Sequence, residues 1–311
     1  MESKTNSSLT STIWLLGFHE FQSLSIFWFL IFLITYCVTM CGNLLIIVVV
    51  SSSRSLHSPM YFFLTQLSVS DILLTTTIVP NMLHTLLCDG SSMSLVGCLI
   101  QYHFFAASEI LQTLLLTVMS YDRYQAICNP LHYSMVMNPT FCLGIVALVW
   151  LINLVVLLVI SVTMSLLQFC GPNIIDHFFC DRDPILELSC SDTFIIEFEF
   201  MFLMTVLAAC PFIIILISYI YIIITILKIS TPTGRQKTFS TCSSHLAVVS
   251  TCYGSAISIY LFPNKVTAKK IPSLLYTVVT PLLNPIIYSL LNRDITQAFR
   301  NLCRSLKLDT Q

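Results

Sequence analysis

The sequence predicts an all-α membrane protein, a seven-transmembrane helix bundle followed by a short amphipathic helix at the C-terminus. Of the 311 residues, 56% are hydrophobic and only 9% are charged, whereas about a quarter of the residues of a soluble domain are charged. Charged residues are also nearly absent from seven long runs of the chain. Each run supplies the roughly 20 apolar residues that a helix needs to cross a bilayer core.

The seven runs place the helices in order along one domain of residues 1–311. Residues 1–23 are the expected extracellular N-terminus, residues 24–291 the helix bundle and residues 292–311 the cytoplasmic tail. The first 25 residues lack the pattern of a removable signal peptide, so the first helix is expected to target the chain. The predicted helices cover residues 24–51, 59–81, 97–125, 141–161, 198–227, 238–262 and 271–291.

The tail has the pattern of an amphipathic helix. Residues 293–308 suit a helix that lies on the inner leaflet with its basic side chains at lipid headgroups, so membrane lipids are expected partners. Cys303 in this stretch is either a palmitoylation site or a buried thiol.

The distribution of Lys and Arg predicts the orientation. An outer N-terminus puts nine of the 14 basic residues on the cytoplasmic side and five outside, and an excess of Lys and Arg marks cytoplasmic loops. The sequon at Asn6 agrees, because glycosylation requires exposure to the secretory lumen. We therefore expect a multi-pass plasma-membrane protein with an extracellular N-terminus.

Four of the 13 cysteines are candidates for disulfide bonds. Cys170, Cys180 and Cys190 lie in one outer loop, and Cys98 lies at the outer end of the third helix. An even set in an oxidising compartment favours two bonds, and the sequence alone permits three pairings. Most other cysteines lie in apolar helices, where a thiol behaves as a small hydrophobe.

Several function classes are disfavoured. The sequence contains no phosphate-binding glycine loop, zinc-ligand spacing or nucleophile elbow, so neither an enzyme nor a bound cofactor is expected. A net charge of -1 provides no basic excess for nucleic acid. The sequence also lacks the internal repeats and paired broken helices that are typical of transporters.

Short motifs follow one another along nearly the whole chain. The third helix ends with MSYDRYQAIC at residues 119–128, the second begins with PMYFFL at 59–64, and the seventh contains PLLNPIIY at 281–288. Further motifs are GN at 42–43, LSVSD at 67–71, PLHY at 130–133, SY at 218–219 and KTFSTCSSHL at 237–246. In this order they resemble the odorant (olfactory) receptors, a family of rhodopsin-like G protein-coupled receptors. The resemblance implies a receptor that binds a small, mostly apolar odorant in the outer half of the bundle and activates a stimulatory heterotrimeric G protein, which raises cAMP.

The resemblance assigns an activation role to Asp122 and Arg123. By position alone, Arg123 would be a snorkelling arginine at the inner end of a helix. In the family picture, Asp122 holds Arg123 at rest, and the released Arg123 lines an inner cavity into which a helix of the G protein inserts. The other expected members of this coupling site are Tyr219, His245 and Tyr288.

Asn43, Asp71 and Asn284 are expected to form an interior polar cluster, because an ionisable side chain in a bilayer core needs polar partners. Two interpretations stay open: the cluster holds a water molecule or a sodium ion, or it is a packing contact between helices. Pro285 removes a helix hydrogen bond beside Asn284 and permits a local bend in the seventh helix.

The resemblance also favours particular disulfide pairs, Cys98 with Cys180 and Cys170 with Cys190, which would fix the outer loop as a lid over the pocket. The segment from His177 to Asp181 resembles a family segment that has been considered a metal site. A disulfide-bonded Cys180 is a poor ligand, so no metal is predicted.

Helical periodicity predicts the wall of the ligand pocket. Counting from Arg123 at 3.6 residues per turn puts four residues of the third helix on or near its interior stripe. The fifth, sixth and seventh helices add apolar side chains and hydroxyl groups, which suits sparingly soluble ligands. The expected ligand-binding residues are Phe105, Ala106, Glu109, Gln112, Leu203, Leu207, Ile257, Tyr260 and Thr277.

Glu109 is the charged member of this wall. Either it pairs with a basic ligand or accepts a hydrogen bond from an alcohol, or it is a protonated or internally bonded structural carboxyl. Two alternatives to an odorant receptor also stay open: a seven-helix receptor for another lipid or peptide ligand outside the nose, and a transporter. A transporter would show ligand flux that does not depend on a G protein.

Overall fold

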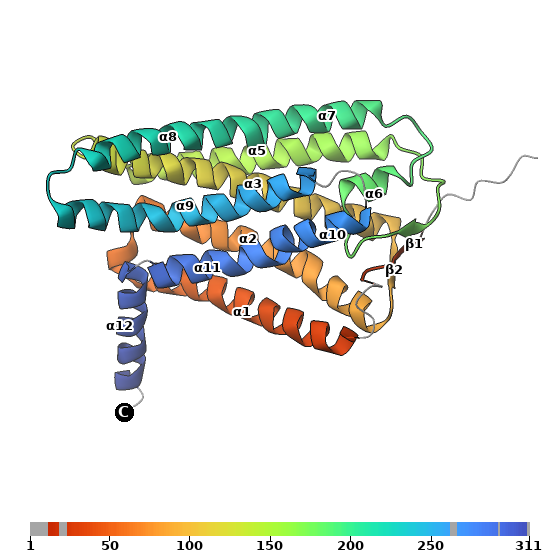
Figure 1. Cartoon of the computed structure of the whole chain (residues 1–311), viewed down its shortest axis with the longest axis horizontal. Helices are drawn as coiled ribbons and strands as arrows, with labels where there is room; N and C mark the ends of the chain where they lie inside the picture. The colour runs from red at the N-terminus through yellow and green to blue at the C-terminus, as the bar shows by residue number, and fades with distance from the viewer. Residues whose placement is uncertain (1–11, 19–23, 262–265, 292, 310–311) are drawn as a thin grey trace, which may run out of the picture.

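The computed structural model describes residues 12–18, 24–261, 266–291 and 293–309. Within these ranges, seven long helical segments lie side by side in a bundle, and the helix α12 (Arg293–Asp309) leaves the bundle at a steep angle (Figure 1). Ile295 and Ala298 of α12 are buried and Arg300 and Arg304 are exposed, as in an amphipathic helix. The predicted fold class, a seven-helix membrane bundle with a C-terminal helix, is confirmed.

The observed helices cover the predicted spans and extend most of them. The first four spans and the sixth are α1 (Ser25–Ser52), α2 (Pro59–Leu87), α3 (Leu95–Cys128), α5 (Pro139–Ser165) and α9 (Pro232–Leu261). The fifth consists of α7 (Phe194–Met204), η3 (Thr205–Ala209) and α8 (Cys210–Leu227), and the seventh of α10 (Val266–Leu274), η4 (Leu275–Val279) and α11 (Thr280–Leu291). Short helices in the connections are η2 (Arg54–Leu56), α4 (Tyr133–Val136) and α6 (Arg182–Leu186).

Local sequence signals explain where several helices begin. Pro59 and Pro139 open α2 and α5, where a missing N–H costs no helical hydrogen bond. The side chain of Ser94 accepts a hydrogen bond from the N–H of Gly97 at 3.0 Å, and that of Asn138 accepts one from the N–H of Phe141 at 2.9 Å. These two side chains therefore cap α3 and α5 by satisfying free N–H groups of the first turn.

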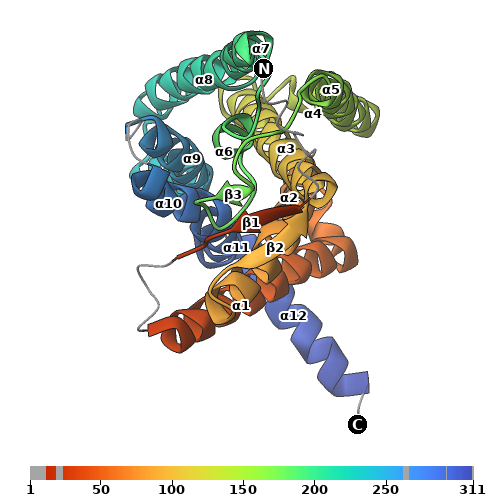
Figure 2. The same cartoon turned by 90° about the vertical axis from the view of Figure 1, so that its right-hand side faces the viewer.

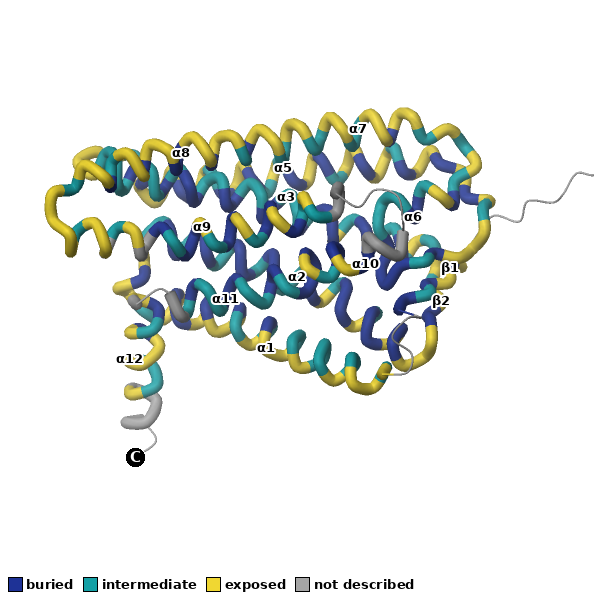
Figure 3. Tube along the Cα trace, in the orientation of Figure 1, coloured by how far each residue is buried: buried dark blue, intermediate teal, exposed yellow. Residues whose placement is uncertain are grey.

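The pattern of exposure is that of a protein surrounded by lipid. Six spans of the described residues are long and apolar enough to cross a membrane, and α9 falls outside this set because it is the least apolar of the long helices. The faces of α1, α5, α7 and α8 that point away from the bundle are exposed (Figure 3). They carry large apolar side chains such as Leu151, Leu154, Leu158, Phe198 and Ile217. Polar groups such as Asn43 and Asp71 are buried inside instead, as expected where no water is available outside the bundle.

A three-stranded sheet lies at one end of the bundle (Figures 1 and 2). The strand β1 (Thr12–Leu15) lies between β2 (Ser91–Ser94), to which it is antiparallel, and β3 (Ile174–Ile175), to which it is parallel. We call this end the sheet end and the opposite end, where α3 finishes, the Arg123 end. The sheet was not predicted from the sequence.

The fifth and seventh spans each contain one π-helical segment, η3 and η4. A π turn inserts an additional residue into a helix and rotates the residues on either side relative to each other. The helical face on which a residue lies therefore changes across each of these segments.

Candidate ligand pocket and the polar network beneath it

A cavity of about 170 Å³ lies between α3, α5, the fifth span, α9 and the seventh span, towards the sheet end. The residues 166–193, which we call the lid, contribute to its wall through Asp181, Arg182 and Asp183. Most of the other wall residues are apolar or aromatic. They are Tyr102, Phe105, Ala106, Glu109, Ile110, Thr113, Val156, Ile160, Phe200, Leu203, Met204, Leu207, Ala208, Cys252, Tyr253, Ala256 and Tyr276.

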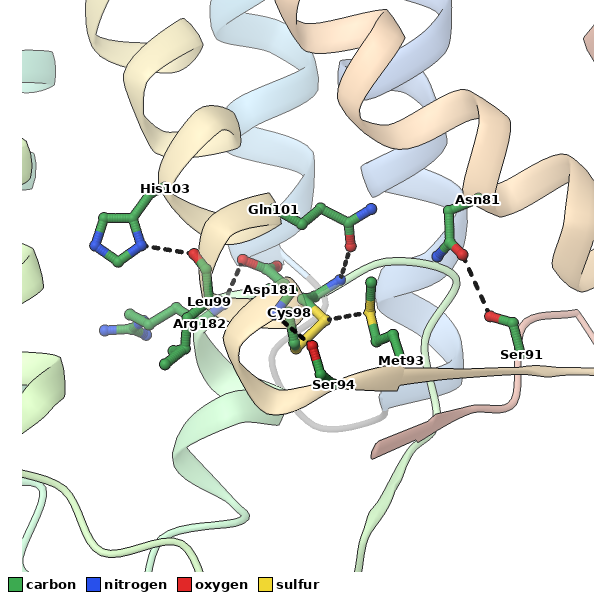
Figure 4. The surroundings of a disulfide bond; sticks show 12 residues. Asn81, Ser91, Met93, Ser94, Cys98, Leu99, Gln101, His103, Asp181 and Arg182 are labelled. Atoms are coloured by element: carbon green, nitrogen blue, oxygen red, sulfur yellow. Dashed lines mark hydrogen bonds between the residues drawn. A yellow bond between two sulfur atoms is a disulfide. The ribbon is translucent and has the colours of Figure 1, made fainter. Parts of the chain in front are cut away.

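Two disulfide bonds hold the lid. Cys98 of α3 is bonded to Cys180, with 5.4 Å between the Cα atoms, and Cys170 is bonded to Cys190 within the lid, with 5.8 Å between the Cα atoms. Gln101 reinforces the first bond: its Oε1 accepts a hydrogen bond from the N–H of Cys180 at 2.9 Å (Figure 4). The same side chain donates from Nε2 to the carbonyl of Thr77 in α2 at 3.0 Å. The lid is therefore fixed to α3 beside the cavity, and Gln101 connects this contact to α2.

Three charged residues of the lid that line the cavity, Asp181, Arg182 and Asp183, contact one another. Asp181 caps α6 by accepting a hydrogen bond from the N–H of Arg182 at 2.7 Å. The guanidinium of Arg182 forms an ion pair with Asp183 and lies 3.5 Å from the centre of the Phe200 ring. Arg182 thereby joins the lid to the fifth span through a cation–π contact.

The structure brings five of the predicted pocket residues together in the wall of the cavity. They are Phe105, Ala106 and Glu109 from α3, with Leu203 and Leu207 from the fifth span. Phe105 meets the ring of Phe179 in the lid edge-on at 5.1 Å between centroids, and the ring of Tyr276 at 6.0 Å.

Three other predicted residues, Gln112, Ile257 and Thr277, do not line this cavity. Gln112 lies one turn deeper along α3, in a polar network described below. Ile257 is 49% exposed, because the cavity-facing stripe of α9 runs through Cys252 and Ala256 and the next residue lies about 100° further round the helix. Thr277 is buried within η4 and bonds the carbonyl of Ser273.

The side chain of Tyr260, the remaining predicted pocket residue, lies outside the described residues.

Other wall residues were not predicted from the sequence. In the seventh span, Tyr276 of η4 takes the position in the wall that the sequence assigned to Thr277. Tyr102 lies one turn from Phe105 on the same face of α3, so helical periodicity could have identified it. No helical periodicity in the sequence predicts that the three lid residues line the cavity.

A buried polar network lies below the cavity. Asp71 of α2 accepts a hydrogen bond from Nε2 of Gln112 at 2.8 Å, and its two oxygens accept from Nδ2 of Asn284 at 3.2 and 2.9 Å. The hydroxyl of Tyr276 donates to Oε1 of Gln112 at 3.4 Å. Since Tyr276 also lines the cavity, a chain of hydrogen bonds runs from the pocket wall to the seventh span at Asn284.

Asn43 belongs to a neighbouring contact rather than to the carboxylate itself, which corrects the expected cluster. Its Nδ2 donates to the carbonyl of Pro281 at 3.3 Å and to that of Thr39 at 3.0 Å. The carbonyl of Pro281 needs this partner, because Pro285, four residues later, has no N–H to donate. A side chain on Gly42 would lie only 3.0 Å from Pro285, so the glycine permits the close approach of α1 to α11.

Asp122 holds three hydrogen bonds at the Arg123 end. Arg123 donates to its Oδ2 from Nε at 3.1 Å and from Nη2 at 2.7 Å, and the hydroxyl of Tyr133 donates to its Oδ1 at 2.8 Å. Tyr133 lies in α4, outside the spans, where burial and the adjacent carboxylate raise its pKa. The Tyr133 hydroxyl therefore keeps its proton and remains a donor at neutral pH.

The other three residues expected at the coupling site lie nearby on the later spans. The hydroxyl of Tyr219 and Nδ1 of His245 are 2.6 Å apart, and both residues are buried. Tyr288 is fully buried, and its hydroxyl has no hydrogen-bond partner among the described residues. The described part of the chain therefore has Arg123 paired with Asp122 and separate from the Tyr219–His245 contact.

A family model described as olfactory receptor matches residues 32–305, which is most of the chain. The chain belongs to the olfactory receptor family. It is 45% identical over 289 residues to olfactory receptor 10A7 of Homo sapiens, with 92% of each chain covered. It is 43% identical over 305 residues to olfactory receptor 1M1 of Mus musculus, with 97% of each chain covered, and 45% identical over 305 residues to olfactory receptor 1L4 of Homo sapiens, covering 97% of this chain and 98% of that receptor.

Family membership confirms the resemblance that the sequence motifs carry. An olfactory receptor is a G protein-coupled receptor that senses odorants, is a multi-pass protein of the plasma membrane and is not an enzyme. For this receptor, the motif residues Asp122 and Arg123 lie together at one end of the bundle, and the cavity lies towards the other.

Proposed function

We propose that this receptor binds a small, largely apolar odorant in the cavity under the lid and, when occupied, activates a stimulatory heterotrimeric G protein, which raises cAMP. The cavity carries this proposal. Its volume is about 170 Å³, and an engineered apolar cavity of about 150 Å³ is large enough to bind benzene. The ligands that fit without expansion of the pocket are therefore molecules with one ring or a short branched chain.

The hydrogen-bond chain below the cavity supports coupling between the two ends. A ligand in the cavity contacts Tyr276, which lies in the π-helical segment η4 and is hydrogen-bonded to Gln112. A shift of η4 would alter the contacts of Asp71 with Asn284, and so the position of α11. We assign Asp71, Asn284 and Asn43 to holding the seventh span in its resting position.

At the Arg123 end, we propose that activation separates Arg123 from Asp122. The freed guanidinium would then line a cleft with Tyr219, His245 and Tyr288, into which the C-terminal helix of the G protein inserts. A ligand shifts this equilibrium only by its difference in affinity for the two arrangements.

We infer that the sheet end faces the outside of the cell and the Arg123 end the cytoplasm. Two disulfide bonds at the sheet end support this orientation, since disulfides form in oxidising compartments. The excess of Lys and Arg in the loops and tail at the other end agrees with it. Asn6, the expected glycosylation site, lies outside the described residues.

A cAMP reporter assay tests the proposal. Cells that express the receptor with a stimulatory G protein would be screened against a diverse panel of one-ring and short-chain odorants, and surface expression measured with an N-terminal epitope. We expect at least one odorant to raise cAMP, and Arg123→Ala to abolish that response at equal surface expression. A full response in Arg123→Ala, or ligand uptake without cAMP, would contradict the proposal.

A further inference from the structure

Glu109 presents a carboxyl group to the cavity without a protein partner. It lies near the middle of α3 and lines the cavity. Among the described residues, no side chain or backbone group forms a hydrogen bond or ion pair with its carboxyl group; the hydrogen bond from Thr113 goes to the backbone carbonyl of Glu109. This differs from Asp71, the other carboxyl group deep in the bundle, which accepts bonds from two side chains.

Neither protonation state of Glu109 is satisfied by the described protein groups. An ionised carboxylate at membrane depth needs a cation or several donors, and a neutral carboxyl carries an O–H that needs an acceptor. The cavity is the space from which such a partner can come. A molecule in the cavity can therefore bond directly to the carboxyl group of Glu109.

The charges around the cavity determine whether the site favours a cationic or an anionic ligand group. Asp181 is near enough to Glu109 for the two carboxylates to repel each other. Glu199 of α7 lies within electrostatic reach of the cavity residue Tyr102, and both of its oxygens are buried without a hydrogen-bond partner among the described residues. A further anion or electron-rich acceptor at this position would add to the repulsion, whereas a cation would relieve it.

The one described cation in the wall is already engaged. Arg182 forms its ion pair with Asp183 and its ring contact with Phe200. The three carboxyl groups of the described wall, those of Glu109, Asp181 and Asp183, thus outnumber its single guanidinium, and Glu199 lies nearby. The described wall is acidic on balance.

The remaining wall suits the rest of a small organic cation. The rings of Tyr102, Phe105 and Tyr276 all line the cavity with Glu109, and aromatic faces attract an ammonium group. Val156, Leu203 and other aliphatic side chains supply apolar surface for a hydrocarbon body.

We propose that this cavity selects small monoamines: a protonated primary or secondary amine whose ammonium group pairs with Glu109 and whose hydrocarbon body, of about one ring in size, fills the apolar part of the wall. This inference rests on the proposal that the cavity is the odorant site. It adds to that proposal the chemical class of the ligand and one specificity-determining residue.

The test compares amines with alcohols of the same shape. The full-length receptor, purified in lipid nanodiscs, would be titrated at neutral pH with benzylamine, cyclohexylamine and isopentylamine and with benzyl alcohol, cyclohexanol and isopentanol, and affinity obtained from thermal stabilisation. We expect at least one amine to bind about 30-fold or more tightly than its alcohol, the scale expected for a buried charge pair.

Variants of Glu109 test whether its charge causes the tighter binding of amines than of alcohols. Glu109→Gln keeps the shape of the side chain and should bring each amine to within about threefold of its alcohol, while Glu109→Asp should keep part of the preference. Glu197→Gln is the matched control, because Glu197 is exposed on α7 and accepts a hydrogen bond from Thr193 away from the cavity wall. It should leave all affinities unchanged.

Three results would overturn the inference: alcohols that bind as tightly as their amines, an amine preference that survives Glu109→Gln, or the absence of binding by all six compounds. A cAMP assay with the same compounds, in cells that express the receptor, separates this inference from the proposed function. Amines that bind through Glu109 without raising cAMP would refute the signalling proposal alone. Neutral odorants that raise cAMP while no amine binds would refute the amine inference alone.

Discussion

The contact between Lys270 and the lid offers a quantitative test of how the sheet end is held. Nζ of Lys270 donates to the carbonyl of Gly17, just after β1, at 2.8 Å and to Oδ1 of Asp176 in the lid at 2.6 Å. The Lys270 side chain is 8% exposed and that of Asp176 is 42% exposed. One ammonium group thus joins the seventh span to both the N-terminal strand and the lid.

The expected cost of Lys270→Met follows from these two contacts. A hydrogen bond from a charged donor contributes about 1.5–3 kcal/mol, and an ion pair with a partner as exposed as Asp176 contributes at most about 1 kcal/mol after solvent screening. Methionine preserves much of the apolar stem. The lid and β1 should therefore open about 2–3 kcal/mol more easily, a change of about 30-fold to 160-fold in the opening equilibrium.

Amide hydrogen exchange measures this opening directly. The N–H of Leu16 donates to the carbonyl of Ile175 and that of Gly17 to the carbonyl of His177, so both amides report on the junction between β1 and the lid. Exchange of the peptide that contains them should accelerate by the factor above in Lys270→Met.

The variant Asp176→Asn keeps an oxygen that accepts the hydrogen bond and loses only the charge. It should accelerate exchange by no more than about fivefold, because a screened ion pair contributes about 1 kcal/mol or less. Unchanged exchange in Lys270→Met, or an effect of Asp176→Asn as large as that of Lys270→Met, would refute the reasoning.

Two further predictions concern stability. Asn284→Ala removes both hydrogen bonds from Asn284 to Asp71 and should cost about 2–3 kcal/mol, because the buried carboxyl group of Asp71 loses one of its two partners. It should lower the thermal unfolding midpoint more than Asn43→Ala, which leaves one carbonyl unpaired, and the opposite order would contradict the assigned network. Cys170→Ser opens a loop whose ends are 20 residues apart and should lower the free energy of unfolding by about 3 kcal/mol, measured by thermal unfolding of receptor purified with and without reductant. Reductant should lower the midpoint less in Cys170→Ser, which keeps only the Cys98–Cys180 bond, than in wild type, and equal midpoints for wild type and variant without reductant would contradict the prediction.

The helices could be predicted from the sequence because a membrane imposes a simple rule. A span must be long, apolar and internally hydrogen-bonded, so hydropathy located all seven segments, although α2 continues to Leu87, beyond the predicted end at residue 81. The sheet could not be predicted in the same way. Its strands are two to four residues long and pair segments that are far apart in the sequence, and such short strands carry no alternating pattern long enough to recognise.

The pocket was predicted only in part, for a related reason. On α3, an uninterrupted helix, counting at 3.6 residues per turn correctly identified the face that carries Phe105 and Glu109. In the seventh span, Tyr276 of the π-helical segment η4 lines the wall rather than the predicted Thr277. Local sequence gives no signal for the contribution of the lid, which depends on the disulfide to Cys98.

Energetic coupling between the cavity and the Arg123 end is the central claim, and reciprocal binding tests it most directly. The affinity of one active odorant would be measured on purified receptor in nanodiscs, with and without a nucleotide-free stimulatory G protein. We predict at least about fivefold tighter odorant binding in the presence of the G protein, since coupling between two sites acts equally in both directions, and loss of this gain in Arg123→Ala. Identical odorant affinity with and without the G protein would show that the two ends are independent and would contradict the account.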